Sequence, residues 1–74
     1  SMHYTQRGRE VLNIMDRPYK TTIVEEHVVT APNEDRWLNH FWIDEQTGQV
    51  RKFQQQLGPS LPMIEMTFLK PYSS

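Results

Sequence analysis

Apolar and polar residues alternate in short segments along the chain, and proline or glycine separates most of these segments. Tyr19–Ala31 is dense in threonine, valine and isoleucine, the β-branched residues that fit a pleated surface. Arg36–Asp44 is rich in aromatic residues, and Met63–Lys70 alternates between apolar and polar positions. The pattern therefore favours strands over helices along most of the chain.

Two further segments, Glu10–Met15 and Gln49–Gly58, bring the expected strands to five. Turn residues in Ala31–Asp35 and a rigid corner at Gly58–Pro62 join strands that are neighbours in sequence. We therefore predict an all-β fold, an antiparallel meander that forms a curved sheet or half-barrel. A short helix over Tyr4–Asn13 is the alternative at the N-terminal end, although a glycine within it weakens a helix.

The best defined connection is the turn Asp44–Gly48, with the sequence DEQTG. It fits a hairpin loop in which Gly48 takes the left-handed conformation that glycine adopts at low cost. We assign structural roles in turns to Asp44, Thr47 and Gly48, and to Pro59 at the next corner.

Counting outward from this turn predicts the register of the flanking strands, with Ile43 opposite Val50 and Trp42 opposite Arg51. Both faces of the predicted hairpin then carry apolar or aromatic residues. One face holds Trp37, Phe41, Ile43 and Val50, and the other holds Leu38, His40, Trp42, Arg51, Phe53 and Leu57. Such a sheet needs cover on both sides, so we expect a homodimer or a part of a larger protein.

Composition and charge narrow the classes of protein to consider. The 74 residues allow one small β domain over 1–74, in which we interpret Ser1 and Met2 as remnants of an expression tag. Without cysteine, disulfides and CxxC motifs are excluded. Basic and acidic residues are interspersed along the chain and sum to a net charge of −1. The absence of a basic cluster argues against a nucleic-acid partner. No apolar run approaches the roughly 20 residues of a transmembrane helix.

Several residues of the aromatic hairpin are candidates for contact with a glycan or a protein. They are Trp37, His40, Trp42, Arg51 and Gln55. Tryptophan beside arginine and glutamine offers a stacking platform for sugars, and a Trp–Arg cation–π contact contributes about 0.5–1 kcal/mol when exposed. The alternative interpretation is an ordinary cross-strand pair that protects one face of the sheet.

The sequence gives little support to catalysis or to a metal or cofactor. Glu25 and His27 point to the same side of a strand, but no third metal ligand follows at a recognisable spacing. Glu25 and Glu26 are adjacent, so they point to opposite faces and cannot flank one bond. A GxSxG motif and a glycine-rich phosphate loop are both missing. We therefore predict a non-enzyme without cofactor or metal.

The segment Val24–Tyr72 resembles the C-terminal part of the group 4 capsule polysaccharide lipoproteins, the YjbF/GfcB-like family. The resemblance is strongest in NHFWIDEQTGQVRKFQQQLGP, Asn39–Pro59, and in MTFLKP, Met66–Pro71. The positions that match, including Trp42 and Gly48, are interpreted as structural. The resemblance therefore implies no catalytic residue in this chain. Family members are longer and carry a lipidated N-terminal cysteine, which this chain lacks; lipid anchoring is therefore not carried over.

The resemblance implies an all-β accessory protein of capsule or exopolysaccharide assembly and secretion, in the periplasm or outer membrane of a Gram-negative bacterium. Its expected partners are other envelope or secretion proteins, a second copy of itself, or the polysaccharide. Two alternatives stay open: a homodimerising β assembly module unrelated to polysaccharide, and a fragment of a lipoprotein carrier similar to LolA.

Overall fold

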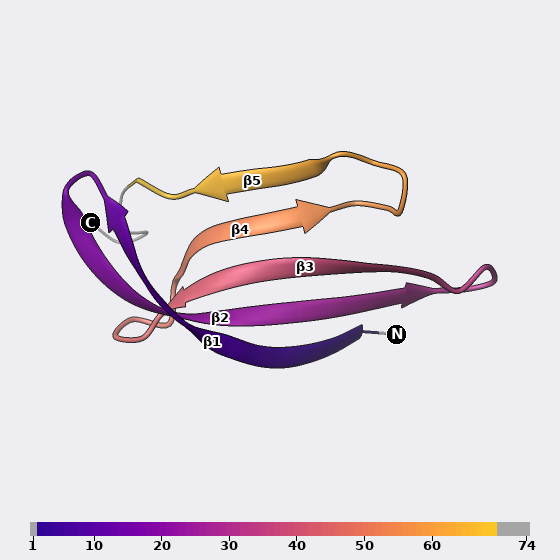
Figure 1. Cartoon of the computed structure of the whole chain (residues 1–74), viewed down its shortest axis with the longest axis horizontal. Coiled ribbons are helices and arrows are strands. Elements are labelled where there is room, and N and C mark those ends of the chain that lie inside the picture. The colour runs from indigo at the N-terminus through magenta and orange to yellow at the C-terminus, as the bar shows by residue number, and fades with distance from the viewer. Residues whose placement is uncertain (1, 70–74) are drawn as a thin grey trace.

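The computed structural model describes residues 2–69, which form one antiparallel sheet with its strands in sequence order (Figure 1). The strands are β1 (Met2–Ile14), β2 (Arg17–Thr30), β3 (Asp35–Asp44), β4 (Val50–Gln56) and β5 (Met63–Thr67). The predicted five-stranded all-β meander is confirmed. The alternative helix over 4–13 is wrong, because these residues lie within β1. Ser1 and Lys70, which the predictions included, lie outside the described residues.

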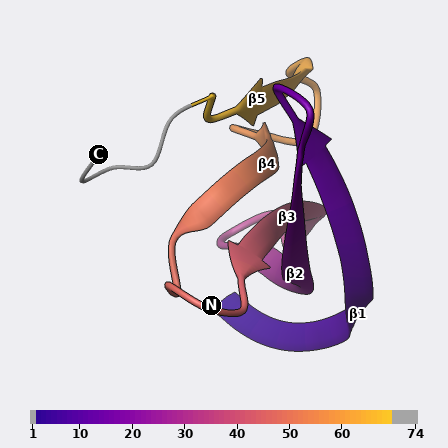
Figure 2. The ribbon, with the colours of Figure 1, turned by 90° about the vertical axis from the view of Figure 1, so that its left-hand side faces the viewer.

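The sheet is strongly curved and remains open, with β1 and β5 as its two edges (Figure 2). The molecule measures 43 × 22 × 20 Å. Five flat strands would span only about 19 Å in one direction and be much thinner in the other. The third dimension of 20 Å therefore reflects the curl of the sheet. Residues 2–69 contain no helix long and apolar enough to cross a membrane.

β1 is longer than the sequence indicated because Gly8 interrupts its pairing without ending the strand. The register with β2 shifts between Gln6 and Gly8, and Gly8 has a φ of +151°. This bulge bends β1 and lets the strand continue. At its end, Met15 and Asp16 have φ values of 52° and 64°, the pattern of a two-residue type I′ turn.

The β3–β4 turn is organised around Asp44. Its carbonyl accepts a hydrogen bond from the Gly48 amide at 2.9 Å, and its own amide donates to the Gln49 carbonyl at 2.8 Å. The Asp44 carboxylate accepts from the amides of Gln46 and Thr47 at 2.8 and 3.3 Å. Gly48 has a φ of +76°, a conformation that disfavours any residue with a Cβ.

The β4–β5 corner is closed by a side chain from the end of β4. The Gln56 amide group donates to the carbonyls of Pro59 and Leu61 at 3.1 and 2.9 Å. The Leu61 amide donates to the Gly58 carbonyl at 3.2 Å. Pro59 therefore lies in a hydrogen-bonded corner that turns the chain back onto β4.

A second bulge changes the register next to the β3–β4 turn. Ile43 lies opposite Val50, as predicted, but Trp42 lies opposite Lys52. Arg51 is the extra residue between these pairs, so the predicted pairing of Trp42 with Arg51 is wrong. A count from the turn assumes regular alternation, which a bulge interrupts.

The bulge also changes the face on which the later residues of β4 lie. The ring of Phe53 joins those of Phe41 and Phe68, with centroids 6.4 and 6.0 Å away. The prediction had placed Phe53 beside His40 and Trp42, which lie on the opposite face.

The buried interior of this sheet is mainly polar. Only Ile14 and Trp42 are buried apolar residues among those described. The buried polar residues are Thr21, Glu25, Glu26, Asn39, Asp44 and Arg51. Hydrogen bonds and ion pairs therefore hold neighbouring strands together at positions where most sheets bury aliphatic side chains.

Candidate functional site

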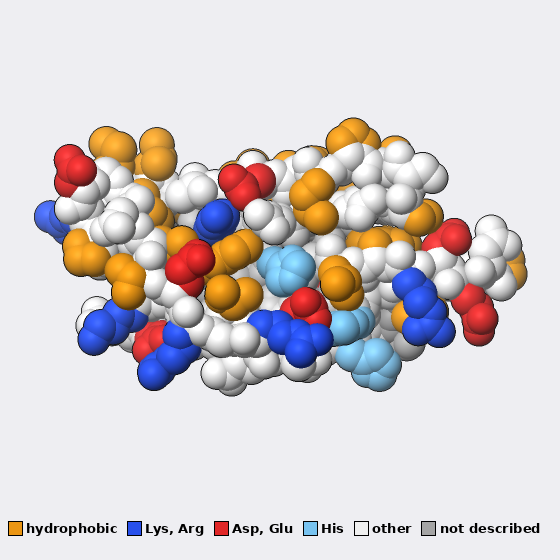
Figure 3. All heavy atoms as spheres, viewed as in Figure 1, with side chains coloured by type: hydrophobic (Ala, Val, Ile, Leu, Met, Phe, Trp, Pro, Cys, Tyr) orange, Lys and Arg blue, Asp and Glu red, His pale blue; other side chains and the backbone are white. Residues whose placement is uncertain are grey.

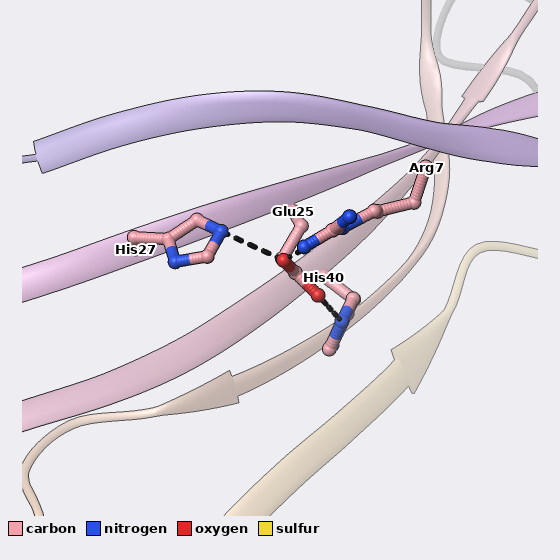
Figure 4. Close-up of polar contacts among 4 residues, drawn as sticks. All are labelled: Arg7, Glu25, His27 and His40. Carbon is pink, nitrogen blue, oxygen red and sulfur yellow. Dashed lines mark hydrogen bonds and ion pairs between the residues drawn. The ribbon is translucent and has the colours of Figure 1, made fainter.

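Four charged or titratable side chains meet on one face of the sheet, and we name them the carboxylate cluster: Arg7, Glu25, His27 and His40 (Figure 4). One Glu25 oxygen lies 2.9 Å from Arg7 Nε and 2.7 Å from His27 Nε2. The other lies 3.0 Å from His40 Nε2. The cluster thus joins β1, β2 and β3 through one carboxylate.

Strand pairing explains why these side chains meet. Glu25 and His27 are two residues apart in β2, so they share a face, and His40 lies directly opposite Glu25 in β3. Arg7 comes from the β1 bulge. Histidine side chains lie beside acidic and basic groups on the face shown in Figure 3. No sequence spacing links His40 to Glu25, so this contact could not be predicted from the sequence.

The electrostatics of the cluster keep the carboxylate ionised at neutral pH. The hydrogen bond from Arg7 and the contact with His40 lower the pKa of Glu25, against the opposing effect of burial. The Glu25 side chain is only 10% exposed, whereas Arg7 is 55% exposed. Among residues 2–69, no group of three potential ligands is arranged to hold a metal ion. A carboxylate with three close partners is best suited to holding neighbouring strands together.

The lowered pKa of Glu25 predicts a loss of stability in acid. Its stabilising effect is fully present above the ordinary carboxyl pKa of about 4.3 and disappears as the pH falls through the lower folded value. We expect Glu25→Gln to be less stable than the parent at pH 7, with the gap narrowing below about pH 4. Urea denaturation across this range measures the gap. The exposed Glu34→Gln should follow the parent throughout, and parallel profiles for Glu25→Gln would contradict the prediction.

Trp42 is covered by its neighbours and offers no free ring face for stacking. It is 7% exposed, and its indole Nε1 donates to the Glu10 carboxylate at 2.9 Å. Lys52 Nζ lies 4.5 Å from the ring centroid, so the cation–π partner is a lysine and not the predicted arginine. The His40 ring is 6.3 Å from the Trp42 ring on the same face.

Arg51 is also buried, with 4% of its surface exposed. Its Nε and Nη2 atoms both lie 2.9 Å from one oxygen of Asp44. Its guanidinium carbon lies 4.3 Å from the centroid of the Tyr19 ring. Arg51 therefore holds the turn against the start of β2.

The remaining predicted contact residues lie on the other face. Trp37 and Gln55 are both half-buried, and strand alternation places them on the side opposite His40 and Trp42. The indole Nε1 of Trp37 is buried, with no hydrogen-bond partner among the described residues. The five predicted contact residues therefore do not form one surface.

A second polar network on the Trp37 face also escaped the sequence analysis. Asn39 donates to the Glu26 carboxylate at 2.8 Å and accepts from the backbone amide of Gln56 at 2.7 Å. Tyr4 donates to the other oxygen of Glu26 at 2.8 Å. These contacts join β1, β2, β3 and β4 through two buried residues, Glu26 and Asn39.

Comparisons with known proteins show the family to which the chain belongs. The family model described as "Group 4 capsule polysaccharide lipoprotein gfcB, YjbF" matches residues 1–69. The uncharacterized lipoprotein GfcB of Escherichia coli (strain K12) is 42% identical over 71 residues, which cover 96% of this chain and 33% of that protein.

The crystal structure of the hypothetical lipoprotein YmcC from Escherichia coli (K12) is similar, with a TM-score of 0.86 and 41% identity. The match covers 95% of this chain and 36% of that one, so the chain spans about a third of the length of these relatives. The resemblance inferred from the sequence is thereby confirmed, and its extent includes β1. The chain belongs to the family of group 4 capsule polysaccharide lipoproteins.

Proposed function

We propose that this chain acts as a non-catalytic accessory domain in the assembly or secretion of a capsule or exopolysaccharide. It works in the periplasm or at the outer membrane of a Gram-negative bacterium. The family match over residues 1–69 is the observation that carries this proposal. The geometry favours contact over catalysis, because the Glu25 carboxylate is occupied by three partners and Asp44 is paired with Arg51.

The surface best suited to a protein partner is the edge strand β5. All five of its residues are exposed, and its apolar members Met63, Ile64 and Met66 are 45–49% exposed. An edge strand with exposed apolar side chains can pair with a strand of another protein. A second copy of this chain is the alternative occupant, and sedimentation velocity at several concentrations separates a monomer from a homodimer.

Deleting the gene in its host and measuring surface polysaccharide tests the proposed function. We expect the deletion to reduce the polysaccharide and the parent gene to restore it. His40→Gln should restore it equally, because glutamine keeps a hydrogen-bond donor for Glu25 but cannot act as an acid–base group at neutral pH. A His40→Gln protein that accumulates normally but fails to restore the polysaccharide would overturn the non-catalytic assignment. Unchanged polysaccharide in the deletion strain would overturn the function itself.

A further inference from the structure

The β1–β2 hairpin and the β3–β4 turn lie at the same end of the sheet, on the left of Figure 1. Between them is a hollow of about 430 Å³. Its walls include Arg17, Tyr19 and Lys20 from the start of β2, and Thr47 from the turn. The buried Arg51 also lines it. This volume lies within the range of small-ligand sites, about 300–1,000 Å³.

The uncompensated charge of the hollow is positive. Arg51 is neutralised by Asp44, which is the only carboxylate among the residues that line the hollow. Arg17 and Lys20 are exposed, and within residues 2–69 neither forms an ion pair. Glu45 lies close by in the turn, but its carboxylate is bound by Arg9 through two contacts of 2.9 Å. The residues that line the hollow therefore include two cations without an ion pair.

The other walls suit the ring of a sugar. The Tyr19 side chain provides aromatic surface, against which the C–H groups of a pyranose can pack. Gln46 and Thr47 add an amide and a hydroxyl group that can bond to sugar hydroxyls. Arg51 packs against the Tyr19 ring, with 4.3 Å between guanidinium carbon and ring centroid, so the aromatic side chain is held in place before a ligand arrives.

We propose that this hollow binds an acidic saccharide unit, with its carboxylate attracted by the positive charge of Arg17 and Lys20 and its ring against Tyr19. The inference deepens the proposed function and rests on it, because it names the polysaccharide chemistry that the domain would contact. Arginine and lysine form charge-assisted hydrogen bonds to carboxylates, and these are about twice as strong as neutral ones. A neutral saccharide lacks this contribution.

Titrating the protein with trigalacturonate at low salt tests the site, with amide NMR and calorimetry as readouts. We expect shifts at the amides of Gln46 and Thr47, and much weaker binding of the neutral maltotriose. The double variant Arg17→Gln/Lys20→Gln should lose about tenfold or more in affinity, since it removes the charge-assisted contacts to the carboxylate. Arg36→Gln is the matched control, because this exposed arginine of β3 lies outside the hollow.

Three results would overturn the site: no binding of trigalacturonate, equal binding by the double variant, or equal affinity for maltotriose. Inorganic sulfate that binds as tightly as trigalacturonate would overturn the saccharide assignment by showing a general anion site. The gene deletion separates this inference from the proposed function. If the double variant restores surface polysaccharide and trigalacturonate does not bind, the site fails and the function stands. If deletion leaves the polysaccharide unchanged, the function fails whatever the binding result.

Discussion

Asp44→Ala is expected to lower the free energy of unfolding by about 3–5 kcal/mol, because it leaves a buried charge without its partner. The Asp44 and Arg51 side chains are 6% and 5% exposed, and two guanidinium nitrogens lie 2.9 Å from one carboxylate oxygen. The substitution also removes the acceptor for the amides of Gln46 and Thr47. These hydrogen bonds hold the pKa of Asp44 below its ordinary value although burial alone would raise it.

Urea denaturation of the parent and Asp44→Ala at neutral pH measures the loss. Glu45→Ala is the matched control, because it breaks an ion pair of the same length with Arg9, whose side chain is 74% exposed. Exposed pairs contribute about 0–1 kcal/mol, so the control should cost no more than that. Equal losses in the two variants would show that burial of the Asp44–Arg51 pair has no energetic consequence, contrary to the prediction.

The second large effect is expected for Asn39→Leu, which should cost about 2–4 kcal/mol by leaving buried polar partners unsatisfied. Asn39 is 3% exposed and makes two hydrogen bonds that leucine cannot replace. Its amide nitrogen donates to Glu26, which is itself 8% exposed, and its oxygen accepts from the backbone amide of Gln56. The variant therefore weakens the connection of β3 to β2 and to the end of β4.

Two measurements test this substitution. Urea denaturation gives the overall loss, and hydrogen exchange should show a selective loss of protection at the Gln56 amide. Asn33→Leu in the exposed β2–β3 loop is the matched control and should stay within about 0.5 kcal/mol of the parent. Unchanged protection at Gln56 in Asn39→Leu would contradict the assigned role of Asn39, even if the overall stability fell.

The strands were predictable where the signal lies within a few neighbouring residues. The β-branched residues of β2 and the aromatic residues of β3 indicated both strands almost to their ends. The Met15–Asp16 turn was missed, because Met-Asp is not one of the glycine-containing pairs that signal a type I′ turn. The bulge at Gly8 was missed as well, since a glycine in a strand marks either an end or a bulge, and only the pairing partner distinguishes them.

The candidate sites depended on contacts that no local pattern encodes. Alternation along one strand assigns Glu25 and His27 to a common face, but it does not show that Arg7 and His40 approach the same carboxylate. The face assignment of β4 also failed after Arg51, because the bulge shifts every later pair by one residue.

The sequence by itself therefore determined the all-β class, the order of the strands, the Asp44–Gly48 turn and the family. These features depend on side-chain shape and backbone preference within short segments. Such preferences do not require contacts between residues that are far apart in the sequence. Only the tertiary structure decided that Trp42 and Arg51 are buried, that Glu25 is bound by residues of three strands, and that two cations flank a hollow at the turns. Burial and ion pairing depend on distances between strands, and a bulge of one residue is enough to change them.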